Sequence, residues 1–395
     1  MKSVLINGRV FDGEVLHEGL AVVLEDGKVS ALLPVEDIPD GTDVSHDLVS
    51  YDLEGHILAP GLIDIQVNGG GGVMFNDAPT VETIRRIGAA HRRYGTTGFL
   101  PTLISSDAGT MKQAIEAVGQ AIAVGVPGVL GIHLEGPYLN ADKRGIHHAE
   151  RFRPIDEAAI ELLTSLPEGC TLVTIAPELT SPDTISRLTD SGILVFGGHS
   201  AASYQQTRKA LKAGLRGFTH LFNAMSPLEA REPGVVGAAL EDKESWFGII
   251  ADGQHVHPAA FAVAVAAKRK GRALLVTDAM ATVGSDSRTF TFDGADIEVV
   301  DGSCRMPSGA LAGSNLDMLT AVRNAIHFTG MEPAEALRMA SAYPAAALGL
   351  EGQLGFIRPG FRANFIELDD DLNLYCSWID GEAQVSEYVS KPWKS

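Results

Sequence analysis

An apolar run that ends in a polar side chain recurs along this chain and constrains its fold more than any other feature. Residues 129–137 read Val-Leu-Gly-Ile-His-Leu-Glu-Gly-Pro, so a buried strand brings Glu135 to its carboxyl end, where Gly-Pro breaks the strand. The apolar runs 193–198 and 217–219 lead in the same way into His199 and His220. One carboxylate and two imidazoles at strand ends suit a divalent metal with an open coordination position.

The pattern of strand, loop and helix repeats from Pro60 onward. Helical stretches such as 80–94, which ends at Gly95, separate most of the strands. This alternation favours an α/β fold, a (β/α)8 TIM-like barrel of the metal-dependent hydrolase type, with an open doubly wound sheet as the structural alternative. The candidate strands lie near residues 62–67, 97–103, 129–135, 171–177, 193–199, 217–222, 246–252 and 273–278.

Both ends of the chain have β character instead. The last segment, 351–395, contains short apolar strands and the turn pair Asp380-Gly381. We therefore predict that residues 1–58 and 351–395 together form a small β-sandwich domain, and that 59–350 form the catalytic barrel. Four hairpin-type turn pairs mark the first segment: Asn7-Gly8, Asp12-Gly13, Asp26-Gly27 and Asp40-Gly41.

Composition limits the partners of the protein. The 395 residues carry a net charge of −19, which argues against a nucleic-acid-binding surface. No apolar run approaches the ~18 residues of a membrane span, and the N-terminus becomes polar too soon for a secretory signal. The three cysteines form neither a disulfide framework nor a metal motif. We expect a cytoplasmic protein with no nucleic-acid or membrane partner.

Barrel enzymes place their chemistry at the carboxyl ends of the strands. We assign Glu135, His199 and His220 to the metal, with zinc the first expectation and iron, cobalt or manganese as substitutes. Asp278 follows the last strand and is the candidate general base for a water activated by the metal. A structural aspartate that caps the next loop is the alternative role for Asp278.

Two loops carry further candidates. His147 and His148 follow Lys143 and Arg144, and one of them could polarise a carbonyl group opposite the metal, although loop histidines are more often only surface residues. After His220, the side chain of Asn223, the backbone at Ala224 and the side chain of Arg231 could bind an anion. A solvated arginine is an equal alternative for Arg231.

Together these motifs resemble the amidohydrolase superfamily, and within it the N-acetylglucosamine-6-phosphate deacetylase family. The two segments at 133–137 and 219–225 are the more specific part of the resemblance. The matching segments are Ala-Pro-Gly-Leu-Ile-Asp at 59–64, His-Leu-Glu-Gly-Pro at 133–137, Gly-His-Ser at 198–200, Thr-His-Leu-Phe-Asn-Ala-Met at 219–225, Ala-Asp-Gly-Gln-His at 251–255, Val-Thr-Asp-Ala at 276–279 and Leu-Ala-Gly-Ser at 311–314.

The resemblance implies a metal-dependent enzyme that hydrolyses N-acetyl-D-glucosamine 6-phosphate to D-glucosamine 6-phosphate and acetate. Asp278 would accept and then donate a proton, and His147 would polarise the acetyl carbonyl. Arg231 would reach the phosphate in the neighbouring subunit, which implies a homodimer. The implied substrate-binding residues are Gln66, His147, Asn223, Ala224, Arg231, His255, Leu311, Ala312 and Gly313.

The first strand bears on the number of metal ions. Many members of the superfamily carry His-x-His there for a second metal, whereas this chain reads Gln66-Val67-Asn68, and amides are poor zinc ligands. Strand 171–177 also lacks the lysine that bridges two metals in other members. We therefore predict one metal ion per subunit. Two alternatives stay open: an amidohydrolase of a different N-acyl or cyclic amide, and a non-catalytic phosphosugar-binding sensor.

Overall fold

The computed structural model describes residues 2–38 and 48–386. These residues form two compact units. One unit is drawn from residues 1–63, 92–98 and 331–395, and the other from 64–91 and 99–330. The predicted division into 1–58 with 351–395 and 59–350 stays a prediction, and the units drawn here differ from it mainly by placing 331–350 with the chain ends.

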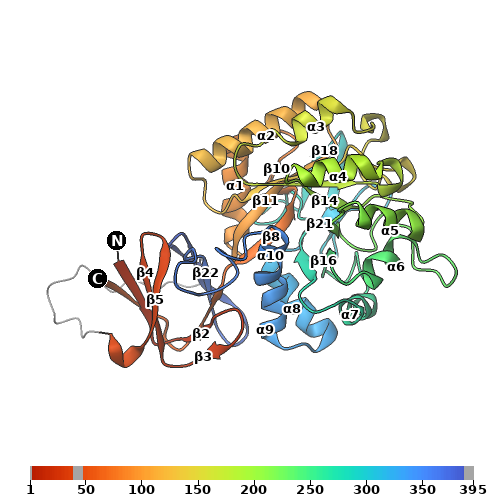
Figure 1. The fold of residues 1–395 in the computed structure, drawn as a ribbon. Helices are drawn as coiled ribbons and strands as arrows, with labels where there is room; N and C mark the ends of the chain where they lie inside the picture. The colour runs from red at the N-terminus through yellow and green to blue at the C-terminus, as the bar shows by residue number, and fades with distance from the viewer. Residues whose placement is uncertain (1, 39–47, 387–395) are drawn as a thin grey trace. The chain divides into compact units, whose positions relative to one another are not determined.

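A parallel eight-stranded sheet forms the barrel (Figure 1). The backbone N–H of Asp278 donates to Gln66 O at 3.1 Å, and that of Asn68 donates to Ala279 O at 2.9 Å, which joins the last strand to the first. The predicted (β/α)8 barrel is therefore confirmed, and the open sheet is wrong. In sheet order the strands are β17 (Ala273–Val276), β16 (Trp246–Ile250), β15 (Gly217–Phe218), β14 (Leu194–Gly197), β13 (Cys170–Ile175), β12 (Gly131–Glu135), β11 (Thr96–Ile104) and β8 (Leu62–Val67).

Helices follow the strands, as the sequence predicts. The predicted helix 80–94 is α1 (Val81–Arg92), and the helix after residue 203 is α5 (Tyr204–Lys212). Ser203 caps α5 by accepting a hydrogen bond from Gln206 N, which satisfies a backbone donor that the first helical turn leaves free. The other helices of this unit are α2 (Ala108–Ala123), α3 (Glu157–Leu163), α4 (Pro182–Asp190), α6 (Gly234–Glu241), α7 (Pro258–Ala267) and α8 (Met318–Thr329).

The other unit contains two sheets around one apolar core, as a β-sandwich requires. Leu5, Leu58, Phe365 and Trp378 belong to that core and come from both ends of the chain. The predicted turn pair Asp40-Gly41 lies outside the described residues. The sheets run β5 (Lys28–Pro34), β4 (Leu20–Glu25), β1 (Lys2–Ile6), β6 (Leu48–Asp52), and β24 (Glu382–Val385), β23 (Leu374–Ile379), β22 (Phe365–Leu368), β7 (Ile57–Pro60), β2 (Arg9–Phe11), β3 (Leu16–His17). This unit also holds α9 (Pro333–Met339) and α10 (Ala342–Ala347).

A four-stranded antiparallel sheet follows the last barrel strand, and the sequence reasoning missed it. Its strands are β18 (Thr289–Phe292), β19 (Ala295–Val300), β20 (Ser303–Arg305) and β21 (Leu311–Ser314). Two turn pairs, Asp293-Gly294 and Asp301-Gly302, separate the first three of these strands, and both aspartates have positive φ angles, 48° and 50°. These are the same turn signals that predicted the strands at the N-terminus.

No helix of the described residues is long and apolar enough to cross a membrane.

Gly217 in β15 offers a test of how closely the barrel is packed. A Cβ added there would lie 2.5, 2.7 and 2.8 Å from three ring atoms of Phe196 in β14. We expect Gly217→Ala to lower the free energy of unfolding by about 1–3 kcal/mol, because the ring is fully buried and cannot move away. Thermal denaturation measures this. Gly352→Ala is the control, since no atom lies within 4 Å of its added Cβ, and equal melting temperatures for both variants would contradict the prediction.

Candidate metal and catalytic site

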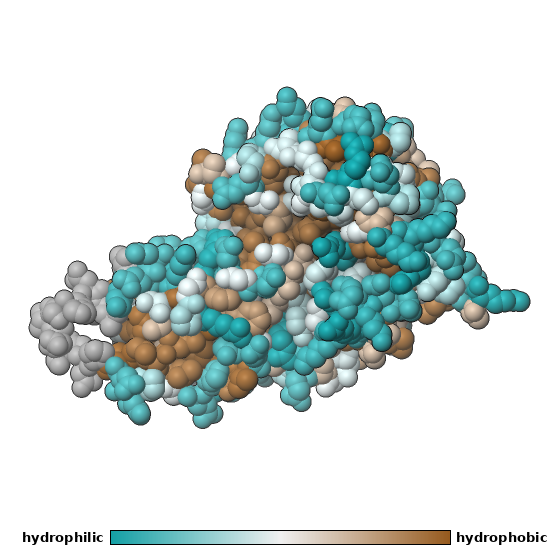
Figure 2. Space-filling view, viewed as in Figure 1, coloured by the Kyte–Doolittle hydropathy of each residue, from teal (hydrophilic) through white to brown (hydrophobic). Residues whose placement is uncertain are grey.

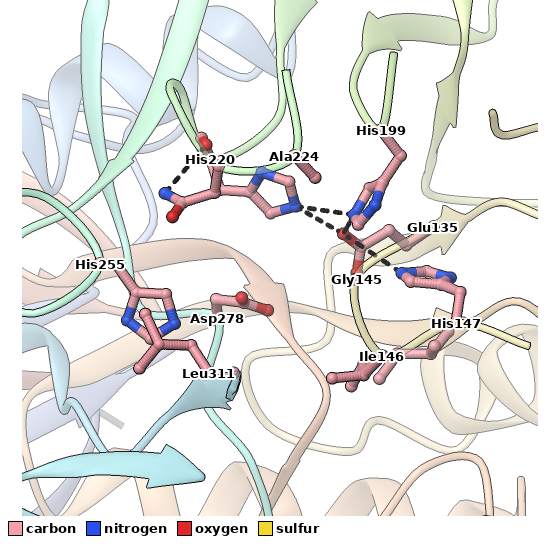
Figure 3. A pocket seen from close by; sticks show the side chains of 13 residues that line it. Glu135, Gly145, Ile146, His147, His199, His220, Ala224, His255, Asp278 and Leu311 are labelled. Carbon is pink, nitrogen blue, oxygen red and sulfur yellow. Dashed lines mark hydrogen bonds and ion pairs between the residues drawn. The ribbon is translucent and has the colours of Figure 1, made fainter. Parts of the chain in front are cut away.

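Three side chains meet at the carboxyl ends of barrel strands (Figure 3). Glu135 ends β12, His199 follows β14 and His220 follows β15. His199 Nε2 lies 3.2 Å and His220 Nε2 lies 2.9 Å from Glu135 Oε1, and the two nitrogens lie 3.0 Å from each other. All three residues are at most 5% exposed. Among the described residues, this is the only group of three or more such side chains that could hold a metal ion.

The backbone at these strand ends has an uncommon conformation. The φ angles of His199, His220 and Asp278 are 46°, 30° and 53°, in the left-handed region that non-glycine residues rarely adopt. Each such residue costs about 1–3 kcal/mol and persists only where the surrounding structure holds it. Backbone hydrogen bonds do so here, since the carbonyl groups of His199 and Asp278 accept from Asn140 N at 3.0 Å and Ser314 N at 2.9 Å.

The hydrogen bonds around the cluster suit a divalent cation. His199 Nδ1 lies 2.8 Å from the backbone oxygen of Lys143 and must donate to it, so His199 Nε2 keeps its lone pair for a metal. Burial opposes the charge on Glu135, but the adjacent imidazoles of His199 and His220 hold the pKa of the Glu135 carboxyl well below its usual value. Two imidazole nitrogens and an ionised carboxylate oxygen converging at this spacing are a fitting donor set for a divalent metal.

Asp278 is held by two amides from the first barrel strand. Asn68 Nδ2 donates to Asp278 Oδ1 at 2.7 Å, and Gln66 Nε2 donates to the same oxygen at 3.1 Å. Gln66 Nε2 also donates to Glu135 Oε1 at 3.2 Å. Burial, followed by the negative charge of Glu135, raises the pKa of Asp278 to about 6, which is where a group that must both accept and donate a proton is most effective.

His147 lies beside the cluster on the other side from Asp278 (Figure 3). Its Nε2 is 4.0 Å from Glu135 Oε1, and its Nδ1 is 2.7 Å from Ser105 Oγ. Burial and the nearby His199 lower the pKa of His147 well below its usual value, so the ring is neutral and carries one N–H. If Ser105 donates to Nδ1, that N–H is on Nε2 and can serve a carbonyl oxygen. His148 is a surface residue, 3.0 Å from Glu150.

Most of the predicted site residues line one cavity, and three of them, Ala312, Arg231 and Gln66, do not. Ala312 is fully buried in the core under β18–β21, and Arg231 is exposed on the loop 226–233 that projects from the barrel (Figure 1), where hydrophilic side chains cover the tip (Figure 2). Gln66 lies between the two carboxylates. The others line a cavity of about 190 Å³ together with Ile104, Gly145 and Ile146, and they are Glu135, His147, His199, His220, Asn223, Ala224, His255, Asp278, Leu311 and Gly313.

Two partners in the site were missed by the sequence reasoning. Ser105 directly follows strand β11, so the rule that barrel strands end in functional side chains would have found it. The backbone oxygen of Lys143, which orients His199, carries no sequence signal, because every residue has such an oxygen. His133, in contrast, is buried and lies 2.8 Å from Thr174 Oγ1, 3.1 Å from Ile65 O and 3.4 Å from Thr102 Oγ1.

Comparison with known proteins agrees with this architecture. Residues 57–386 match the Amidohydrolase family. An N-acetylgalactosamine-6-phosphate deacetylase from Shewanella sp. (strain ANA-3) is 43% identical over 93% of this chain and 92% of its own length. The crystal structure of the N-acetylglucosamine-6-phosphate deacetylase from Pasteurella multocida is 35% identical, covers 98% of this chain and 100% of its own, and has a TM-score of 0.92.

A third similar structure holds a ligand. It is a mutant of the N-acetyl-D-glucosamine-6-phosphate deacetylase from Mycobacterium smegmatis in complex with N-acetyl-D-glucosamine-6-phosphate, 30% identical with a TM-score of 0.85 over 97% of this chain and 99% of its own. A barrel with a buried His/Glu cluster at its carboxyl end is the arrangement of a metal-dependent hydrolase. The chain belongs to the amidohydrolase family and, within it, to the branch that these deacetylases form. The resemblance found in the sequence is thereby confirmed.

Asp278→Asn tests the assignment of the base. Asparagine keeps an Oδ1 that accepts from Asn68 and Gln66, and it leaves all three metal-ligand candidates in place, so we expect normal folding and metal content. Because the amide cannot accept a proton, we expect kcat to fall about 10²- to 10⁴-fold. Steady-state kinetics and metal analysis on the same preparation check this. Turnover close to that of the wild type would rule out Asp278 as the base.

Proposed function

We propose that the protein hydrolyses the acetamide of N-acetyl-D-glucosamine 6-phosphate and releases D-glucosamine 6-phosphate and acetate. The observation that carries this proposal is the position of Asp278, a partly buried carboxyl group with a raised pKa that faces the Glu135–His199–His220 cluster within one pocket. The family and the names of the relatives support the deacetylase over the two alternatives, a different amide substrate and a non-catalytic sensor.

The residues of the chain divide the reaction among them. Asp278 takes the proton of the attacking water and afterwards gives it to the amine nitrogen as the C–N bond breaks. His147 donates its single N–H to the acetyl oxygen as negative charge develops there, which requires that Ser105 Oγ donates to His147 Nδ1 and so leaves the N–H on Nε2. A divalent ion bound by Glu135, His199 and His220 would supply Lewis acidity and lower the pKa of water.

We further propose one metal ion per subunit, and zinc as that ion on chemical grounds. Two imidazoles and one carboxylate suit zinc, and iron, cobalt or manganese can use the same donors. Gln66 and Asn68 support the single ion, because their amide N–H groups are engaged with the carboxylates of Glu135 and Asp278. The predicted contact of Gln66 with substrate stays a prediction, and its present contacts suit a role in orienting Asp278.

The phosphate group belongs at the other end of the pocket, in this proposal. Asp278 lies between His255 and the metal-ligand cluster in Figure 3. His255 Nδ1 lies 2.6 Å from Asp252 Oδ2, which leaves Nε2 for a ligand. Asn223 and the backbone at Ala224 line the same pocket. Arg231 is exposed to solvent on its loop, and Leu228 on the same loop is 55% exposed, which supports a homodimer in which the partner subunit's Arg231 completes the site. The free cysteines agree with a cytoplasmic location.

The C4 epimer, N-acetyl-D-galactosamine 6-phosphate, is a second candidate substrate. The specific reason is the relative from Shewanella, which is named for that sugar and shares 43% identity, against 35% for the Pasteurella structure named for the glucosamine sugar. Both sugars present the same acetamide and the same phosphate, so the chemistry above applies to either. Only contacts with the hydroxyl at C4 separate them.

Acetate release by the purified protein tests the proposed function. We expect release from N-acetylglucosamine 6-phosphate with about one metal per chain, loss of activity after chelation, and recovery with Zn²⁺. N-acetylgalactosamine 6-phosphate measured in parallel gives the ratio of the kcat/KM values for the two epimers. N-acetylglucosamine without phosphate is the control for recognition of the anion. No release from either phosphosugar by the metal-loaded protein would refute the proposal.

Complementation between subunits tests the shared site. Arg231→Ala and Asp278→Asn should each be nearly inactive alone, since each removes one component from every site. In a heterodimer of the two variants, the subunit that keeps Asp278 receives the partner subunit's Arg231, so one of its two sites is complete. Random pairing should restore about a quarter of the wild-type sites. Absence of any recovery after co-expression would contradict the exchange of Arg231 between subunits.

A further inference from the structure

A phosphorylated sugar poses a charge problem for this pocket. A phosphate monoester brings nearly two negative charges at neutral pH, while Glu135 and Asp278 already line the cavity and the chain carries a net charge of −19. No lysine or arginine is among the residues that line this cavity. Arg231 would come only from a second subunit under the proposed function. A cation supplied at the rim by the same chain would offset part of this repulsion.

Arg305 occupies the suitable place on the rim. It ends β20 and pairs directly with Leu311 of β21, and directly opposed residues on antiparallel strands have side chains on the same face of the sheet. Leu311 lines the pocket and lies next to His255 in Figure 3. The guanidinium of Arg305 reaches towards the same corner, since its Nη2 donates to Gln254 Oε1 at 3.4 Å, and Gln254 directly precedes His255.

Among the described residues Arg305 forms no ion pair, although Glu298 of β19 stands directly opposite it on the neighbouring strand. The two hydrogen bonds of Arg305 go to neutral acceptors, the side-chain amide of Gln254 and the backbone oxygen of Gly309, the latter at 3.1 Å from Nη1. The amide contact is long, so the guanidinium can leave it for a stronger acceptor. Arg151, by comparison, is held in a two-pronged ion pair with Asp293 at 2.7 and 2.8 Å.

Arg144 is the rival cation, but it lies at the wrong end of the pocket. It precedes Gly145, and a Cβ added to Gly145 would lie 3.3 Å from the ring of His199. The loop that carries Arg144 therefore passes beside the metal-ligand cluster, where the acetamide must bind. Arg305 instead lies with His255 and Leu311 at the end that is left for the phosphate.

We propose that Arg305 binds the phosphate group of the substrate from within the same subunit and so makes the site selective for phosphorylated sugars. This assignment rests on the proposed function and extends it. The planar guanidinium can form two parallel hydrogen bonds to phosphate oxygens, which gives it both the charge and the geometry that the anion requires. The missed β18–β21 sheet thereby gains a role, because it carries Arg305 and Leu311 to the pocket.

Kinetics of the Arg305→Ala and Arg305→Lys variants test the proposal on the metal-loaded protein. We expect Arg305→Ala to raise KM for the phosphosugar about ten- to a hundredfold, with a much smaller change in kcat, because the residue contacts a group remote from the reacting amide. The preference for phosphorylated over unphosphorylated N-acetylglucosamine, as a ratio of kcat/KM values, should fall by a similar factor. Arg305→Lys should recover part of the loss, and the inhibition constant for inorganic phosphate should rise with KM.

Arg288→Ala is the matched control, because it removes the same charge next to the same sheet and its side chain bonds only to the backbone of Val299. It should leave KM close to the wild-type value, which separates direct binding from a general loss of positive charge. Equal KM values for Arg305→Ala and the wild type, or an equal rise in Arg288→Ala, would overturn the assignment while deacetylation by the wild type still stands. A wild type that is inactive on both phosphosugars would instead refute the proposed function itself.

Discussion

The structure depends on one carboxylate oxygen that four barrel strands share. Glu135 Oε1 accepts from Gln66 on the first strand and lies within 3.2 Å of the ring nitrogens of His199 and His220. These side chains can converge only if the sheet closes, because the first and last strands must become neighbours. The closure is also what places Asp278 beside Gln66. The closure of the barrel is thus the condition on which the assembly of the site depends.

This arrangement favours the reaction but lowers the stability of the folded protein. Three of its residues adopt left-handed backbone conformations, and the carboxyl groups of Glu135 and Asp278 lie on either side of the amide of Gln66. Elsewhere each of these features would destabilise the protein by about 1–3 kcal/mol. They persist because the surrounding strands are buried along their whole length, as β12 shows. A cation bound there would relieve the carboxylate repulsion and would therefore contribute to stability as well as to chemistry.

The sequence predicted the barrel well because buried strands and helices leave strong periodic signals. It predicted the strand-end residues for the same reason, since each one interrupts an apolar run. It could not show that His199, His220 and Asp278 have positive φ angles, because nothing in those residue types requires it. Nor could it show that the amide of Gln66 donates to two carboxylates, and the predicted contact of Gln66 with substrate stays a prediction. Ser105 and the β18–β21 sheet did carry usable signals and were missed.

The segments that do not follow the repeating strand–helix pattern of the barrel are the ones that determine which substrate the site accepts. The chemical end of the pocket is built from strand ends and would suit many amides, as the breadth of functions on this fold requires. The opposite end is built from the segment after His220, from His255 and from a sheet inserted after the last strand. Insertions of this kind follow no repeat, so they can change without disturbing the barrel. Differences among related deacetylases in the sugar they take should therefore concentrate there rather than at the metal.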